Sequence, residues 1–346
     1  MSITQSAVPA PAQDPDHGVP WHYGDPLREQ RTLAAGQGAV DLSHFGVVTV
    51  TGPDRLSWLH SLTSQHLDAL LPGASSLALI LSPHGHVEHE LHIVDDDYTT
   101  WLIVAPGTST ELVKYLDSMR FMLRVEVADV TPSFAVVWEP VQAIDPQFPT
   151  WLEPADFAGT GRVAAGSDRG GDASKYVGDR PAPFPGREVI VPREDLINRL
   201  ESHGVVSGTW AWNALRVAAA VPRIGLETDH RTLPHEVGWI GPAVHLNKGC
   251  YRGQEAVARV HNMGHPPRRL VLLHLDGSSE SLPQHGDPVQ LGEKVVGWIA
   301  SAARHYELGP VATAVIKRSV PVTAQLDVMC ADGVMPAIQE VVVATS

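Results

Sequence analysis

Between residues 47 and 130 the spacing of apolar residues alternates between strand-like and helix-like patterns. A β-branched run at 47–50 is followed by leucines at helical spacing over 53–62. Strand-like runs at 77–81 and 87–94 flank a turn that contains Gly85. A further strand is expected at 100–104, a helix from the capping box Thr108-Ser109-Thr110-Glu111 to Met119, and a last strand at 123–127. This order of elements predicts a ferredoxin-like α+β domain.

The pattern changes twice in the rest of the chain. Residues 145–185 are rich in Pro, Gly and Asp, which indicates long loops. A strand at 187–191 and helices starting at Pro192 and Thr209 follow. Beyond residue 266, short strands are expected at 269–275, 288–291, 295–300, 311–316 and 341–344. Such regular short strands predict a small antiparallel barrel or sandwich.

Composition narrows the functional classes. The chain has 346 residues, of which 43% are hydrophobic and 18% charged, which fits two or three globular domains. Its formal net charge of −14 disfavours a direct nucleic-acid partner. No run of residues is apolar enough to span a bilayer, and residues 1–20 suggest a disordered arm, not a signal peptide. Two cysteines alone exclude a disulfide framework of the secreted kind, so a cytoplasmic protein without a membrane partner is expected.

The segment Lys248-Gly249-Cys250-Tyr251-Arg252-Gly253-Gln254-Glu255 carries the clearest chemical signal. Its glycines permit a sharp turn, and the residues that follow permit a helix that ends near Gly264. Cys250 would precede the helix N-terminus with Lys248 and Arg252 beside it, an environment that stabilises a thiolate. The other reading is a small apolar residue packed in a tight turn.

This segment closely resembles the K-G-C-[FY]-x-G-Q-E signature of the YgfZ family, folate-binding relatives of the glycine cleavage T protein, an aminomethyltransferase. The resemblance covers most of the chain. Residues 38–43 and 50–54 are similar to an N-terminal stretch of both groups, and residues 215–227 to an L-R-x-x-x-G-x-P-x-x-G-x-E segment in which Ala220 replaces the first Gly.

The resemblance implies a three-domain ring of the aminomethyltransferase folate-binding type, with a C-terminal β-barrel. The expected parts are a core domain at 21–46 plus 131–264, the ferredoxin-like domain at 47–130 and the barrel at 265–346. It also implies binding of tetrahydrofolate or a one-carbon derivative, and an accessory role in assembly or repair of iron–sulfur client proteins, including tRNA-modifying enzymes. The implied folate-binding residues are Arg216, Glu188, Tyr251 and Gln254, and the candidate catalytic residues are Cys250, Lys248 and Arg252. Trp212 is a further candidate, because its indole offers a stacking surface for a ring, and an aromatic core residue is the equal alternative.

The hairpin near Gly85 departs from the T protein. The T protein has paired Asp residues there, one of which handles the reacting nitrogen of the folate, whereas this chain has His89 and Glu90. The departure favours the accessory role over the alternative, a folate-dependent one-carbon transferase or demethylase, and leaves catalysis open. On a strand His84, His86, Glu88, Glu90 and His92 would share one face. A metal site is one reading of that face, but a solvated hairpin face is the simpler prediction, so no metal is expected.

Overall fold

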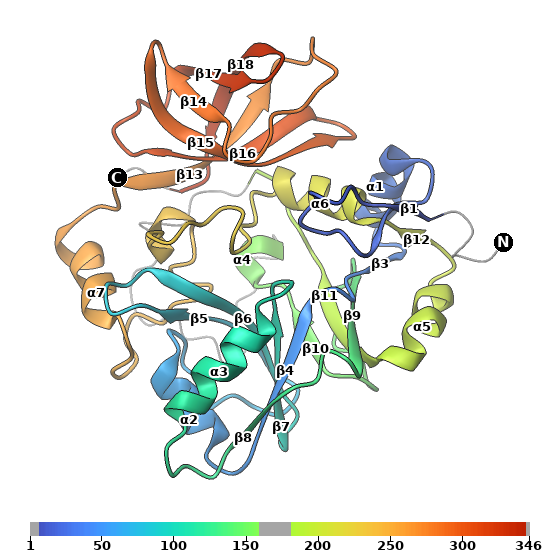
Figure 1. Ribbon diagram of the computed structural model, residues 1–346, viewed down its shortest axis with the longest axis vertical. Coiled ribbons are helices and arrows are strands. Elements are labelled where there is room, and N and C mark those ends of the chain that lie inside the picture. Colours follow the sequence, from blue (N-terminus) through green and yellow to red (C-terminus); the bar gives the residue numbers. More distant parts are fainter. Residues whose placement is uncertain (1–6, 159–180, 344–346) are drawn as a thin grey trace.

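The computed structural model describes residues 7–158 and 181–343, which form three parts (Figure 1). A closed barrel lies at one end, a five-stranded sheet with two helices lies at the other, and a second five-stranded sheet lies between them. The fold class predicted from the sequence is thereby confirmed. Part of the predicted loop region, residues 159–180, lies outside the described residues.

The ferredoxin-like sheet has the strand order β5-β6-β7-β4-β8, with all neighbours antiparallel. The last four strands give the order of a ferredoxin-like fold, and β5 extends the edge. Thr108 precedes α3, but its hydroxyl donates to the carbonyl of Ala105, so the expected capping box does not form. The elements are β4 (Gly46–Thr51), α2 (Arg55–Leu62), β5 (Ser75–Leu81), β6 (Val87–Asp95), β7 (Thr99–Val104), α3 (Ser109–Met119) and β8 (Glu126–Asp129).

The central sheet has the order β10-β11-β9-β3-β12 and draws its strands from distant parts of the chain. Its strands are β3 (Ala39–Asp41), β9 (Phe134–Glu139), β10 (Thr150–Leu152), β11 (Arg187–Pro192) and β12 (Val206–Ser207). Around it lie α1 (Pro26–Ala34), α4 (Ala155–Ala158), η3 (Arg193–Asp195), α5 (Leu196–Ser202), α6 (Thr209–Ala218) and η4 (Pro234–Glu236). The remaining helix, α7 (Gln254–Met263), lies beside the β5–β6 hairpin of the ferredoxin-like sheet (Figure 1).

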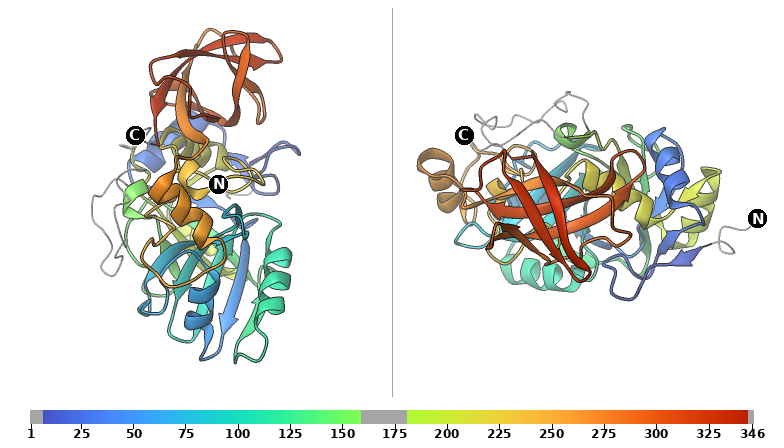
Figure 2. Two further views of the ribbon diagram at one scale, coloured as in Figure 1. Left: turned by 90° about the vertical axis from the view of Figure 1, so that its left-hand side faces the viewer. Right: turned by 90° about the horizontal axis from the view of Figure 1, so that it is seen from above.

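The C-terminal strands close into a barrel of order β13-β16-β15-β14-β17-β18, so the barrel is correct and the sandwich is not. Figure 2 shows the barrel from the side and from above. The last strand begins earlier than the expected 341–344, because residues 333–338 pair with β17 and residues 337–341 pair with β13. The strands are β13 (Arg268–Leu275), β14 (Pro288–Leu291), β15 (Lys294–His305), β16 (Gly309–Lys317), β17 (Gln325–Cys330) and β18 (Gly333–Val341).

The N-terminal segment differs from the expected disordered arm. Residues 7–22 hold a small antiparallel pair, β1 (Val8–Pro9) with β2 (Pro20–His22), and the carboxylate of Asp16 is fully buried. Asp16 accepts hydrogen bonds from Arg223 at 2.8 Å, and its oxygen lies 2.9 Å from His44 Nε2. Polar composition alone therefore misjudged this segment, because one buried ion pair anchors it to the core. None of the helices in the described ranges has the length and apolar character needed to cross a bilayer.

Replacing Asp16 with Asn should lower the free energy of unfolding by about 3 kcal/mol, since Arg223 keeps its buried charge and loses its partner. Burial alone would raise the pKa of Asp16, but Arg223 and His44 outweigh it and hold that pKa well below its usual range. The stabilisation is therefore present above the unfolded pKa and is lost as pH falls through the lower folded value. Urea denaturation at neutral and acidic pH measures both effects.

The matched control is Asp54→Asn, which breaks the exposed ion pair between Asp54 and Arg124. Its effect should be much smaller, because solvent screens that pair. Equal effects of the two substitutions would contradict the anchoring role of Asp16.

Candidate functional site

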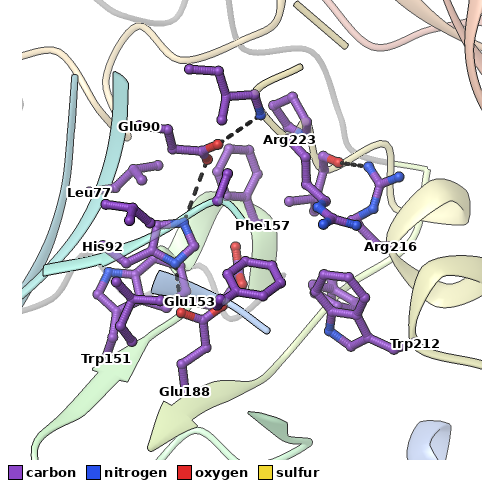
Figure 3. A pocket seen from close by; sticks show the side chains of 18 residues that line it. Leu77, Glu90, His92, Trp151, Glu153, Phe157, Glu188, Trp212, Arg216 and Arg223 are labelled. Carbon is purple, nitrogen blue, oxygen red and sulfur yellow. Dashed lines mark hydrogen bonds and ion pairs between the residues drawn. The ribbon is translucent and has the colours of Figure 1, made fainter. Parts of the chain in front are cut away.

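A pocket lies where the ferredoxin-like sheet, the central sheet and α6 meet (Figure 3). Its walls are mostly apolar and aromatic, and a few charged side chains point into it. Deep apolar pockets with a few convergent polar groups are the usual form of a small-molecule site. The aromatic residues are Phe45, Trp151, Phe157, Phe184 and Trp212, and the charged or ionisable ones are Glu90, His92, Glu153, Glu188, Arg216 and Arg223.

His92 is central to the polar side of the pocket. Its ring stacks on the indole of Trp151, with centroids 3.8 Å apart and planes inclined by 10°. His92 Nδ1 lies 2.7 Å from Glu188 Oε2, and His92 Nε2 lies 3.5 Å from Glu90 Oε1. Glu90 is fixed in turn, because its Oε2 accepts a hydrogen bond of 2.9 Å from the backbone N–H of Ile224. An imidazole thus bridges two carboxylates that come from different sheets.

This arrangement changes the protonation of His92. Burial alone would lower the pKa of the ring, but the carboxylates of Glu188 and Glu90 outweigh burial and raise the pKa to about 10. His92 is therefore a stable imidazolium at neutral pH, with both ring nitrogens available as donors. The cation also lies against the electron-rich face of Trp151, which favours the charged form.

Arg216, a predicted folate-binding residue, does line the pocket, but its guanidinium makes four internal hydrogen bonds. It donates to Glu227 at 3.2 Å and to Ser301 Oγ on β15 at 2.8 Å. The carboxylate of Glu227 also accepts hydrogen bonds from Ser301 and from Thr313 on β16. Arg216 therefore joins α6 to the barrel, and its contact with a ligand would come from the remaining face of the guanidinium.

Arg223 is a second cation in the wall that the sequence did not suggest. Its guanidinium lies over the rings of Trp212 and Phe45, at 5.1 and 5.3 Å from their centroids, and pairs with Asp16. Burial opposes the charge, but Asp16 outweighs it and raises the pKa of Arg223. The pair holds the N-terminal segment against the aromatic side of the pocket.

Of the predicted site residues, Glu188, Trp212 and Arg216 come together in the pocket, and the other five do not line it. The ammonium of Lys248 donates to the carbonyls of His60, Thr63 and Gln65 at the end of α2 and lies 5.0 Å from the ring of Tyr251. Burial lowers the pKa of Lys248 to about 8. Gln254 Nε2 donates to the Lys248 carbonyl at 3.1 Å.

Arg252 and Cys250 lie on the outside of this turn. Arg252 pairs with Glu88 at 2.7 Å and lines a separate surface groove with His86 and His89. Cys250 is exposed and precedes α7, as expected from the sequence, so the reading as a buried apolar residue is not what the structure shows. The cations on either side of Cys250 are engaged with other partners. Its catalytic role therefore stays a prediction.

The predicted histidine face of β6 divides between two sites. Of that face, Glu90 and His92 enter the pocket, whereas His86 and Glu88 line the outer groove together with His89, which was not predicted to share the face, so the face is not simply solvated. Within the described residues no cluster of three or more His, Cys, Asp or Glu side chains could hold a metal ion. The spacing of Glu90 and His92 was the available sequence signal for the pocket. Their place in the pocket wall depends on the tertiary contact between His92 and Glu188, which the sequence does not show.

Comparison with known proteins agrees with this architecture. Residues 16–138 match the GCVT N-terminal domain. The chain is 26% identical over 306 residues to the aminomethyltransferase of Symbiobacterium thermophilum, covering 82% of this chain and 79% of that protein. It is 27% identical over 315 residues to the aminomethyltransferase of Nostoc sp., covering 86% and 81%. The crystal structure of the glycine cleavage system aminomethyltransferase T from Bartonella henselae superposes with a TM-score of 0.75 at 16% identity, over 96% of this chain and 93% of that one.

The chain has the fold of aminomethyltransferase T. That fold accounts for the three parts of the molecule. Ala220, which replaces a glycine of the motif that residues 215–227 resemble, adopts a φ of 51° in the left-handed region. An alanine in that region costs about 1 kcal/mol or more, so the turn after α6 is imposed by its surroundings.

Exposure of Cys250 predicts selective alkylation. Under native conditions iodoacetamide should modify Cys250 at least about tenfold faster than Cys330, because burial raises the pKa of Cys330 and limits access to its sulfur. Peptide mass spectrometry over time gives the two rates, and Cys250→Ser should abolish the fast phase while Cys330→Ser preserves it. Similar rates for the two thiols would contradict the difference in exposure.

Proposed function

We propose that the pocket around Glu188 binds tetrahydrofolate or a one-carbon derivative. The observation that carries the proposal is the carboxylate of Glu188, which lies in the wall of a pocket lined by aromatic side chains. Among the described residues Glu188 Oε1 has no hydrogen-bond partner, and the side chain lines the pocket. A pterin has flat faces and an edge of N–H donors, which such a carboxylate accepts. Phe157, Phe184 and Trp212 offer apolar surface for the ring.

The residues that line the pocket fit a folate in charge as well as in shape. Arg223 and Arg216 lie on the side of the pocket opposite Glu188 (Figure 3), where they favour the electron-rich and carboxylate-bearing end of the ligand. Bound tetrahydrofolate would supply a nucleophilic nitrogen that carries a one-carbon unit. The residues of this chain bind the ring, orient it and exclude water from it.

We further propose an accessory role in the assembly or repair of iron–sulfur proteins, including tRNA-modifying enzymes. The support is the Cys250 segment, which resembles the YgfZ signature, and the exposure of its thiol. An exposed cysteine outside the folate pocket is suited to meeting a client protein. In a strain lacking this protein, the activity of iron–sulfur enzymes should fall, and expression of the wild-type chain should restore it. Unchanged enzyme activity in that strain would refute the accessory role.

Isothermal titration calorimetry with tetrahydrofolate tests the binding proposal. The wild-type chain should bind, and Glu188→Gln should weaken the affinity by about tenfold to a hundredfold, since a charge-assisted hydrogen bond to the ring is lost. The matched control is Glu340→Gln, which breaks a similar Glu–His pair, 2.9 Å to His274, on the barrel surface. Absence of heat with any reduced folate would refute the proposed function.

A one-carbon transferase activity is the second candidate, and one observation favours it. Glu90, which stands where the T protein has an aspartate of its pair, points into the pocket and is held by Ile224 and His92. A carboxylate is therefore available at this wall despite the altered hairpin. Such a group could orient an amine or hold its proton during transfer.

Turnover of a methylamine donor with tetrahydrofolate tests this candidate. If the chain transfers one-carbon units, Glu90→Gln should lower kcat at least about a hundredfold with a smaller change in folate affinity. Folate binding without any turnover would leave the accessory role as the function of the chain.

A further inference from the structure

His92 places a positive charge beside the carboxylates of the pocket wall. Its imidazolium lies 2.7 Å from Glu188, the group proposed to meet the edge of the pterin ring, and 3.5 Å from Glu90. The ring is also fixed by its stack on Trp151. Any ligand edge that approaches Glu188 therefore meets a carboxylate whose charge is already offset by a cation in direct contact.

The other charged groups around the pocket do not replace His92 in this role. Arg216 is paired with Glu227, and Arg223 is paired with Asp16. The groups that face His92 or line the same pocket are Glu90 on β6, Glu188 on β11, Glu153 after β10, Arg216 on α6 and Arg223 after α6. Among the described residues, His92 is the one cation hydrogen-bonded to Glu188.

The distinction matters because two classes of pteridine present different charges at the same edge. A 2-amino-4-oxo ring is neutral at pH 7 and donates ordinary N–H groups. A 2,4-diamino ring is more basic, and a nearby isolated carboxylate raises its pKa and binds it as a cation. A carboxylate already neutralised by an imidazolium gives the cation a much smaller advantage, since the two positive charges repel.

We propose that His92 determines the ligand class of this pocket, by selecting the neutral 2-amino-4-oxo ring of folates against cationic 2,4-diamino rings. The inference rests on the proposed folate function and adds to it the residue that sets specificity. His92 acts through Glu188 and Glu90 and is therefore a positioning residue.

The test compares folic acid with its 4-amino-4-deoxy analogue, which differ at one ring substituent. Calorimetry at pH 7 gives the affinity ratio of the two compounds for the wild-type chain, His92→Gln and His92→Lys. Gln keeps a hydrogen-bond donor near Glu188 without the charge, and Lys keeps the charge without the ring. The matched control is His274→Gln, which removes a histidine from the His274–Glu340 pair on the barrel.

His92→Gln should shift the affinity ratio toward the diamino compound by about tenfold or more, because the freed carboxylate then favours a cation. His92→Lys should keep a ratio close to that of the wild-type chain, and His274→Gln should leave it unchanged. Repeating the titrations in two buffers of different ionisation enthalpy measures proton uptake. Uptake with the diamino compound should rise in His92→Gln, a change that loss of packing alone would not produce.

An unchanged ratio in a His92→Gln chain that still binds folic acid would overturn the inference and leave the folate function standing. If the wild-type chain binds tetrahydrofolate and neither folic acid nor its analogue, the same comparison is made with the tetrahydro forms. Failure of the wild-type chain to bind any folate would refute the proposed function itself.

A second measurement does not depend on the stability of the variants. Heteronuclear NMR of the wild-type histidine rings should show one imidazolium that stays protonated from pH 6 to about 9, because Glu188 and Glu90 outweigh the effect of burial on the pKa of His92. If no histidine ring stays protonated up to about pH 9, the charge on which the inference rests is absent.

Discussion

The buried ion pair between Arg216 and Glu227 joins the central part of this molecule to the barrel. Arg216 lies on α6 in the pocket wall, and Glu227 accepts hydrogen bonds from two barrel residues, Ser301 and Thr313. Both charges are fully buried, so neither could lose its partner without a large cost. Helix α6 therefore both lines the pocket and contacts the barrel, so its position determines the pocket wall and the placement of the barrel.

The same principle, a buried charge satisfied across a long sequence separation, recurs around the pocket. Asp16 and Arg223 join the N-terminal segment to the loop after α6, and His92 joins the ferredoxin-like sheet to Glu188 on the central sheet. Such pairs contribute little net stability compared with apolar packing, but they allow few alternative arrangements. They suit a pocket whose lining comes from three separate parts of the chain.

Much of the fold could be predicted from the sequence, because the ferredoxin-like domain and most of the barrel are built from neighbouring segments with regular apolar spacing; β17 (Gln325–Cys330) was missed and β18 was placed too late in the chain. The central sheet could not, since β3, β9, β11 and β12 are far apart in sequence and very short in two cases. Family motifs led to Arg216 and Glu188, and the stacking surface of an indole led to Trp212, but nothing in the sequence led to Arg223. His92 was noticed only as part of a polar strand face, because its role depends on a contact with Glu188 across 96 residues.

The alternation of β6 has a consequence for how this chain can change over evolutionary time. Glu90 and His92 point into the pocket while Leu91 and Ile93 are buried in the opposite core, so a single-residue insertion within the strand would exchange the two sets. Length changes should therefore be tolerated only at the ends of the hairpin, such as the irregular pairing between Ile80 and Leu81. Substitutions at the two pocket positions, by contrast, keep the register of the sheet but change the buried contact between His92 and Glu188, so a change in the chemistry of this wall also changes how the two sheets are joined.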